Sequence, residues 1–275
     1  MAGIARAVTI ASVAPSSRGQ DDGDQTHVWR GAARQVGMTA EKDVDILVHD
    51  KFFKNRSEPG VFVEVGAALP DYLSISARFR DLGWKIVAIE PNPEFCAAHR
   101  TRGHEVYEYA CSDVDADNVD FFVVDSQGAD YLGGQVSFES FSSLGIKDEF
   151  AKLHETVKSS TRIKTVPVKV RRLDTILKEH EPDIDHIDIL AIDVEGWELN
   201  VMRGLSLEKY NPSVVILENL FQKDEYIEFM KKAGYAMWRR LEPNDVYVAR
   251  NFANIDEPKI SLWSRLLSFV AKPKR

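Results

Sequence analysis

The sequence of 275 residues has little cysteine, no long apolar run and no excess of positive charge. Its two cysteines, Cys96 and Cys111, are too few for a disulfide framework or a four-thiolate zinc site, and their apolar neighbours indicate buried, reduced thiols. No apolar run reaches the roughly 20 residues of a membrane-spanning helix. The 35 Lys and Arg against 43 Asp and Glu give a formal net charge of −8, whereas nucleic-acid binding usually requires a basic face. We therefore expect a cytoplasmic protein without a nucleic-acid partner.

Composition and periodicity divide the chain into four parts. Residues 1–26 are rich in Ser, Gly and Asp and lack an apolar period, which predicts a disordered tail. Residues 27–58 have apolar side chains at helical spacing and predict an N-terminal helical cap. Residues 59–252 alternate between strand and helix signals and form the expected main domain. Residues 256–275 predict a basic amphipathic helix.

The main domain begins with the signals of a strand, a helix and a second strand. Residues 61–65 and 86–89 are short β-rich runs, and residues 72–82 between them have apolar side chains at helical spacing. This order predicts a parallel βαβ unit. Residues 93–100 predict the next helix, and further strand signals follow at residues 106–111, 119–124, 166–170, 187–192, 214–217, 236–240 and 246–249. The sequence therefore predicts an α/β fold with a doubly wound, mostly parallel sheet and an antiparallel C-terminal hairpin at one edge.

Small or polar residues follow five of the predicted strands. In an open parallel sheet, ligands bind outside the carboxyl ends of the strands, where the strand order reverses. Carboxylates at that edge cost free energy unless they bind something. The residues concerned are Glu64, Gly66, Ala67, Glu90, Asn92, Ser112, Asp113, Asp193, Glu195, Glu218 and Asn219. They predict a ligand site at the crest of the sheet.

Five of these residues suit the parts of a nucleoside that carries an amino acid. Gly66 would let the backbone approach a ligand closely. Glu90 could accept two hydrogen bonds from a ribose diol. Ser112 and Asp113 could bind an adenine amino group, and Asp193 could hold an ammonium. Together they predict S-adenosylmethionine as the cofactor, with contacts from Glu64, Gly66, Ala67, Glu90, Asn92, Ser112, Asp113 and Asp193.

An NAD(P)-dependent oxidoreductase of Rossmann type is an alternative, because it also uses a glycine turn and an acidic second strand. Such an enzyme needs G-x-G-x-x-G to admit the pyrophosphate at a helix N-terminus. Residues 66–71 read G-A-A-L-P-D, so the second glycine is missing and Asp71 would repel phosphate. The loop therefore disfavours a dinucleotide.

Two of the strand ends belong to longer motifs. The chain has I-E-P-N-P at residues 89–93 and I-D-V-E-G-W-E at residues 192–198, the latter followed by Arg203 and Gly204. Together with residues 61–74, these stretches resemble the FkbM-type methyltransferases. The resemblance implies a class I, Rossmann-like methyltransferase fold. It also implies S-adenosylmethionine-dependent O-methylation of a small-molecule or glycan hydroxyl.

The first loop departs from the family pattern. The family commonly has G-A-N-x-G there, whereas this chain has G-A-A-L-P at residues 66–70. This difference motivates a further alternative, a catalytically silent methyltransferase-like domain that keeps the fold for binding. The acidic strand ends argue against it, because a silent site does not need unpaired carboxylates.

The acidic residues after the last parallel strands are the candidates for catalysis. Glu195 and Asp193 are the first candidates for a general base that accepts the proton of the acceptor hydroxyl, and Glu218 is the third. Asp193, Glu218 and Asn219 also offer three hard oxygen ligands, which suit Mg²⁺. The alternative is that Glu218 and Asn219 cap the strand or contact the acceptor.

Residues 259–275 read K-I-S-L-W-S-R-L-L-S-F-V-A-K-P-K-R, with an apolar helical face and several basic residues. Such a helix could lie on an anionic membrane surface, and a lipid-linked acceptor would fit that arrangement. A terminal helix that docks on its own domain or on a partner subunit is the alternative.

Overall fold

The computed structural model describes residues 40–70, 72–125, 130–131, 136–137, 143–144, 162–253 and 255. The predicted tail at residues 1–26, the first part of the predicted cap and the predicted C-terminal helix at residues 256–275 lie outside this part of the chain. Within it, none of the helices combines the length and the apolar character that crossing a membrane would require.

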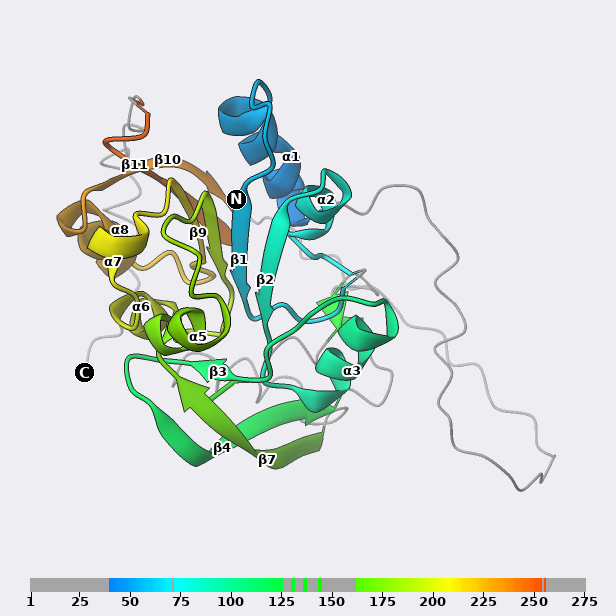
Figure 1. Cartoon of the computed structure of the whole chain (residues 1–275). Helices are drawn as coiled ribbons and strands as arrows, with labels where there is room; N and C mark the ends of the chain where they lie inside the picture. Colours follow the sequence, from blue (N-terminus) through cyan, green and yellow to red (C-terminus); the bar gives the residue numbers. More distant parts are fainter. Residues whose placement is uncertain are drawn as a thin grey trace, which may run out of the picture. The chain divides into compact units, whose positions relative to one another are not determined.

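The main sheet has six strands in the order β10-β11-β9-β8-β1-β2. Its strands are β1 (Val61–Val65), β2 (Lys85–Ile89), β8 (Ile189–Ile192), β9 (Val214–Glu218), β10 (Tyr235–Leu241) and β11 (Asn244–Ala249). The four strands β9, β8, β1 and β2 are parallel, whereas β11 pairs antiparallel with both β9 and β10. The predicted mostly parallel sheet is confirmed, and β10 and β11 are the hairpin at its edge (Figure 1).

The strand order reverses at β1. The next strand along the chain, β2, pairs with one side of β1, and the later strand β8 pairs with the other. Val65 is in register with both Ile89 and Ile192, so the three strands end at the same level. The backbone N–H of Asp193 also donates to the carbonyl of Val65 across 3.0 Å. This is the position at which open α/β sheets bind ligands.

Three of the predicted strands lie in a second sheet. Its strands are β3 (Ala110–Cys111), β7 (Arg162–Arg171) and β4 (Ala116–Asp125), in the order β3-β7-β4. The prediction that residues 106–111, 119–124 and 166–170 belong to the doubly wound sheet is therefore wrong, and only Ala110 and Cys111 of the first run form a strand. More buried and more exposed positions alternate over residues 119–123 and 166–170, and such alternation suits an antiparallel ribbon with one face open to water. Figure 1 shows β4 and β7 as this long ribbon. A further short pair consists of β5 (Asp130–Tyr131) and β6 (Val136–Ser137).

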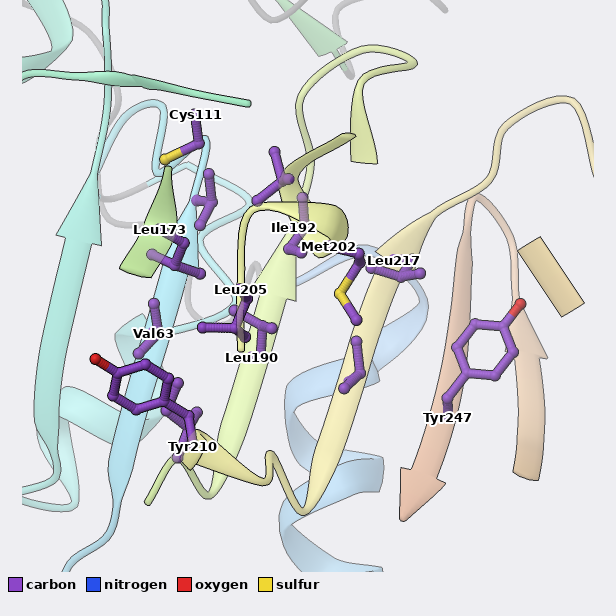
Figure 2. Close-up of a cluster of buried hydrophobic side chains, with 14 of the residues drawn as sticks. Val63, Cys111, Leu173, Leu190, Ile192, Met202, Leu205, Tyr210, Leu217 and Tyr247 are labelled. Atoms are coloured by element: carbon purple, nitrogen blue, oxygen red, sulfur yellow. The ribbon is translucent and has the colours of Figure 1, made fainter. Parts of the chain in front are cut away.

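Apolar side chains of β1, β8 and β9 pack on both faces of the main sheet. Val63, Leu190 and Leu217 point to one face and form the cluster in Figure 2 with residues from four helices. These helices are α5 (Leu173–His180), α6 (Glu198–Arg203), α7 (Leu207–Tyr210) and α8 (Asp224–Lys232). Burial on both sides explains why these strands are nearly continuous apolar runs in the sequence.

The opposite face packs against the start of the described chain. Phe62 and Ile189 contact the cluster that contains Val44 and Val48, both fully buried. The covering elements are α1 (Val44–Val48), which follows the 3₁₀-helix η1 (Glu41–Asp43), the π-helical turn η2 (His49–Phe53) and α2 (Ala77–Asp81). Helix α3 (Pro93–Thr101) packs through Cys96 against Ala88 of β2. The described half of the predicted cap is therefore helical and covers this face.

Helix α2 is shorter than the sequence predicted. The apolar spacing suggested a helix over residues 72–82, but α2 comprises only Ala77–Asp81. Leu73 has a positive φ of 53°, which is incompatible with a helix, and Ser76 is held by the buried carboxylate of Glu64. Helix α3 begins as predicted, because Asn92 caps it by accepting the N–H of Glu94 and Pro93 occupies its first position.

Candidate functional site

The loop after β1 passes close to the end of β8. Gly66 has φ +82°, and a Cβ atom on it would lie only 1.8 Å from the carbonyl oxygen of Asp193. The N–H groups of Gly66 and Ala67 both donate to the carbonyl of Ile89 at the end of β2. Only glycine fits this position, because both the left-handed conformation and the close contact exclude a side chain. The backbone is thus held at the point where the strand order reverses.

Glu90 and Asn92 lie at the end of β2 and are both buried. The two oxygens of the Glu90 carboxylate accept the N–H groups of Ala68 (2.9 Å) and Asn92 (2.8 Å), which fixes its orientation toward the β1 loop. Burial raises the pKa of Glu90 to about 7, against the lowering effect of these two hydrogen bonds. Each carboxylate oxygen keeps a lone pair for a further donor.

The side-chain amide of Asn92 has one free group. Its Oδ1 accepts the N–H of Glu94 (3.0 Å), whereas its buried Nδ2 has no hydrogen-bond partner among the residues that the structure describes. A buried donor without an acceptor is costly, and a bound ligand would satisfy it. The sequence predicted Asn92 as a cofactor contact, and the structure shows that it also caps α3.

Ser112 and Asp113 lie at the end of β3 and are joined to α6. Ser112 Oγ donates to Asp113 Oδ1 (3.0 Å), and Asn200 Nδ2 donates to the same oxygen (3.3 Å). The hydrogen bond from Asn200 is the main cause of a lowered pKa of Asp113. A Cβ atom on Gly204 would lie 2.2 Å from the carbonyl oxygen of Ser112, so this glycine lets the end of α6 approach β3. Asp113 is therefore an oriented, ionised acceptor, as an adenine amino group would require.

Glu64 has a different environment from the one that the sequence predicted. It lies within β1, and its carboxylate accepts both the N–H (3.1 Å) and the hydroxyl (2.5 Å) of Ser76. Burial raises its pKa. These contacts fix the loop before α2, and the contact of Glu64 with a cofactor stays a prediction.

Three carboxylates meet at the ends of β8 and β9. Asp193, Glu195 and Glu218 each offer an oxygen within 4.8 Å of the other two. Glu195 and Glu218 are only 5% and 7% exposed, whereas Asp193 is partly exposed. The parallel register of β8 and β9 places Ile192 beside Leu217, so the residues that follow the two strands are neighbours. We call these three residues the carboxylate cluster.

A strained turn between β8 and α6 carries Glu195. Glu195 and Gly196 have φ values of +56° and +93°. Glu198 fixes this turn, because its Oε1 accepts the N–H groups of Val194 (3.1 Å) and Gly196 (2.9 Å) and its Oε2 accepts the hydroxyl of Tyr226 (2.5 Å). Sequence reasoning missed Glu198 and Tyr226 as positioning residues. The acidic residue at the start of a predicted helix was the available signal.

The carboxylate cluster is short of compensating charge. Burial, together with the negative charges of Glu41 and Glu198, raises the pKa of Asp193 to about 8. The pKa values of Glu195 and Glu218 are also raised well above the usual range, first by burial and then by the charge of Asp193. The cluster can therefore hold protons, or attract a cation, near neutral pH.

The side-chain amide of Asn219 is hydrogen-bonded to other residues of the chain. Its Oδ1 accepts the N–H of Lys223 (2.8 Å) at the start of α8, and its Nδ2 donates to Asp245 (2.8 Å) and to the carbonyl of Lys223 (3.2 Å). The sequence predicted Asn219 as a metal ligand, but the structure supports the alternative of a structural cap. Glu195 takes its place beside Asp193 and Glu218.

The sheet order, the reversal at β1 and the polar strand ends fit a methyltransferase-like α/β fold. Comparison with protein families matches residues 64–237 to the methyltransferase FkbM domain. This match extends from β1 to β10 and includes the strand-end residues from Glu64 to Asn219. The chain therefore belongs to the FkbM methyltransferase family. The search of curated proteins found no match.

Proposed function

We propose that the protein is an S-adenosylmethionine-dependent O-methyltransferase that acts on a hydroxyl of a small molecule or a glycan. The observation that carries this proposal is the Glu90 carboxylate, which is buried at the end of β2 and oriented by the loop after β1. Two hydroxyls of a ribose could donate to its remaining lone pairs. The unpartnered Nδ2 of Asn92 provides a donor at the end of the same strand.

The other predicted cofactor contacts are consistent with this arrangement. Gly66 and Ala67 bring the backbone to the reversal point, where the amino-acid part of S-adenosylmethionine would lie against Asp193. Asp113 would accept a hydrogen bond from the adenine amino group. When it is bound, S-adenosylmethionine supplies a methyl group on a positively charged sulfur.

The loop after β1 also disfavours the dinucleotide alternative. A dinucleotide pyrophosphate is bound at the N-terminus of a helix that follows the glycine loop directly. Here α2 begins only at Ala77 and has five residues. Ala68, which occupies the position of the second glycine, donates its N–H to Glu90, so that group is not available to a phosphate.

Methyl transfer requires the acceptor hydroxyl to lose its proton as its oxygen bonds to the methyl carbon and the carbon–sulfur bond breaks. The loop after β1, residues 66–70, is called the cofactor loop below. The carboxylate cluster lies beside this loop, because Gly66 contacts Asp193. We propose Glu195 as the base that accepts this proton and Asp193 as the residue that orients the reacting groups. Burial and the charge of Asp193 raise the pKa of Glu195, which makes its ionised carboxylate a stronger proton acceptor than an exposed one.

A methyl-transfer assay tests this proposal. The full chain is incubated with S-adenosylmethionine labelled on the methyl group and a panel of phenols, hydroxy acids and free sugars. We expect transfer to at least one hydroxyl, and a loss of about 10²-fold or more in kcat for Glu195→Gln, as is typical for removal of a general base. The matched control is Glu208→Gln, an exposed carboxylate on α7, which leaves kcat unchanged. Equal rates for Glu195→Gln and the native protein would contradict the assignment of the base.

A further inference from the structure

We propose that Asp193, Glu195 and Glu218 bind a hard divalent cation, Mg²⁺ or Mn²⁺, at the ends of β8 and β9. This inference rests on the proposed function, because the cation would lie where the acceptor hydroxyl is expected. It differs from the sequence prediction in its ligands, since Glu195 replaces Asn219.

The separations within the carboxylate cluster suit a single ion. The ligand atoms of the three residues lie within 4.8 Å of one another. Two oxygens on opposite sides of an ion are about 4.2 Å apart at the bond length of Mg²⁺ and about 4.8 Å apart at that of Ca²⁺. Small side-chain movements would therefore bring all three carboxylates onto one cation.

Glu195 provides an independent indication of a ligand. Its Oε2 is buried and has no hydrogen-bond partner within the described part of the chain. The whole residue is only 5% exposed, and it is held in a left-handed conformation with φ +56°. A non-glycine residue in this conformation is strained, and such strain often accompanies a binding function. An orphaned carboxylate oxygen beside two other carboxylates is a ligand position for a cation.

The charges around the cluster favour the same conclusion. No ion pair connects Asp193, Glu195 or Glu218 to a Lys, Arg or His among the residues that the structure describes. Glu41 and Glu198 add further negative charge nearby. Buried carboxylates without a counter-charge are costly, so a bound dication would relieve their repulsion.

The ligand types select the class of cation. All three donors are carboxylate oxygens, which suit Mg²⁺, Mn²⁺ and Ca²⁺, whereas copper and zinc sites usually contain His or Cys. A cation at this position would bind the oxygen of the acceptor and lower the pKa of its hydroxyl. It would thereby promote the same proton loss that Glu195 is proposed to assist.

Calorimetric titration of Mg²⁺ or Mn²⁺ alone into the chelator-treated full chain tests the site. We expect one cation per chain, with affinity at least tenfold lower in Glu195→Gln and in Glu218→Gln. Glu208→Gln is the control and keeps the native affinity. Absence of saturable binding in the native protein would overturn the proposal, as would native affinity in both Gln variants.

A second measurement uses only the native chain, so it does not depend on whether the Gln variants fold. The spin-resonance signal of Mn²⁺ should broaden when the native chain is added and recover when excess Mg²⁺ displaces it. If the signal stays that of free Mn²⁺, the cluster holds only protons or an organic ammonium, and the cation site is excluded. Titration of S-adenosylhomocysteine in the presence of chelator separates the two proposals, because the cofactor should bind even if no cation does.

Discussion

The carbonyl oxygen of Asp193 lies where the Cβ atom of residue 66 would be, only 1.8 Å from that position, and Gly66 leaves the space open. The backbone N–H of Asp193 also donates to Val65, the residue before Gly66. The cofactor loop and the start of the carboxylate cluster are therefore parts of one backbone junction. A change in either is expected to disturb the other.

Gly66→Ala tests this junction. The new methyl group would contact a backbone atom, and φ +82° would strain any residue with a side chain. We expect a stability loss well above the roughly 1–2 kcal/mol of a left-handed residue, together with loss of S-adenosylhomocysteine binding. Gly83→Ala is the matched control, because Gly83 has φ +79° but no atom within 4 Å of the Cβ position. If thermal melting shows equal losses for the two variants, the close contact does not constrain the loop.

Glu90 predicts that cofactor affinity depends on pH. Its pKa is raised to about 7 by burial, and only the ionised carboxylate can accept both ribose hydroxyls. The affinity for S-adenosylhomocysteine should therefore rise as the pH increases from about 6 to about 8. Glu90→Gln should abolish this rise, whereas the exposed control Glu94→Gln should retain it. A pH-independent affinity of the native protein would contradict the role of Glu90.

The ionisation of Glu90 also makes the free energy of unfolding depend on pH. Stability should fall over the pH range in which cofactor affinity rises. Between its usual pKa of 4.5 and about 7, Glu90 keeps its proton in the folded state and loses it in the unfolded state. The folded state binds more protons in this window, so the stability contributed by Glu90 is complete below pH 4.5 and is lost as the pH rises through about 7. We expect the native protein to lose up to about 3 kcal/mol relative to Glu90→Gln over this range. Urea unfolding of both proteins at several pH values measures the difference.

Tyr226→Phe tests how the turn before α6 positions Glu195. The substitution removes the hydroxyl that binds Glu198, and a buried carboxylate left without its donor costs about 1–3 kcal/mol. We expect kcat to fall and the KM for S-adenosylmethionine to stay nearly constant, because the hydrogen bonds of Glu198 hold the turn at Val194 and Gly196 and not the loop after β1. Tyr235→Phe is the control, since its buried hydroxyl donates to the carbonyl of Pro212. It should lower thermal stability without changing kcat, and equal effects on kcat would show that the turn has no special role.

Asn219→Ala distinguishes a structural cap from a metal ligand. The variant loses the hydrogen bonds to Lys223 and Asp245, and we expect a stability loss of about 1–3 kcal/mol. Its affinity for Mg²⁺ should equal that of the native chain. The exposed residue Asn251 supplies the control, Asn251→Ala, with a change below about 0.5 kcal/mol. A tenfold lower Mg²⁺ affinity in Asn219→Ala would restore the ligand set that the sequence predicted.

The strand ends were predictable because parallel strands end at one edge of a sheet. Burial on both faces makes β1, β8 and β9 continuous apolar runs, so the residues that follow them can be identified without a structure. That rule was sufficient to bring Asp193 and Glu218 together. It did not extend to β4 and β7, because neither the apolar run at residues 121–124 nor the alternation at residues 166–171 specifies the partner strand.

The exact contacts of each carboxylate were beyond the sequence. Glu64, Glu90 and Asn219 all occupy strand ends or their neighbourhood, yet Glu64 binds Ser76 and Asn219 closes the loop before α8 by accepting the N–H of Lys223. These roles depend on how the loop that follows each strand folds back onto it, which the sequence does not specify. Glu195 likewise acquires its place from a left-handed turn that the sequence signals only through the following glycine.

Titration calorimetry of S-adenosylhomocysteine tests the central claim most directly. The native chain, Glu90→Ala and the control Glu94→Ala are compared at pH 8 in the presence of a chelator, with NAD⁺ as a second ligand. The account predicts micromolar binding of S-adenosylhomocysteine to the native chain and the control, at least tenfold weaker binding to Glu90→Ala, and no binding of NAD⁺. Binding of NAD⁺, or the same affinity of all three proteins for S-adenosylhomocysteine, would contradict it.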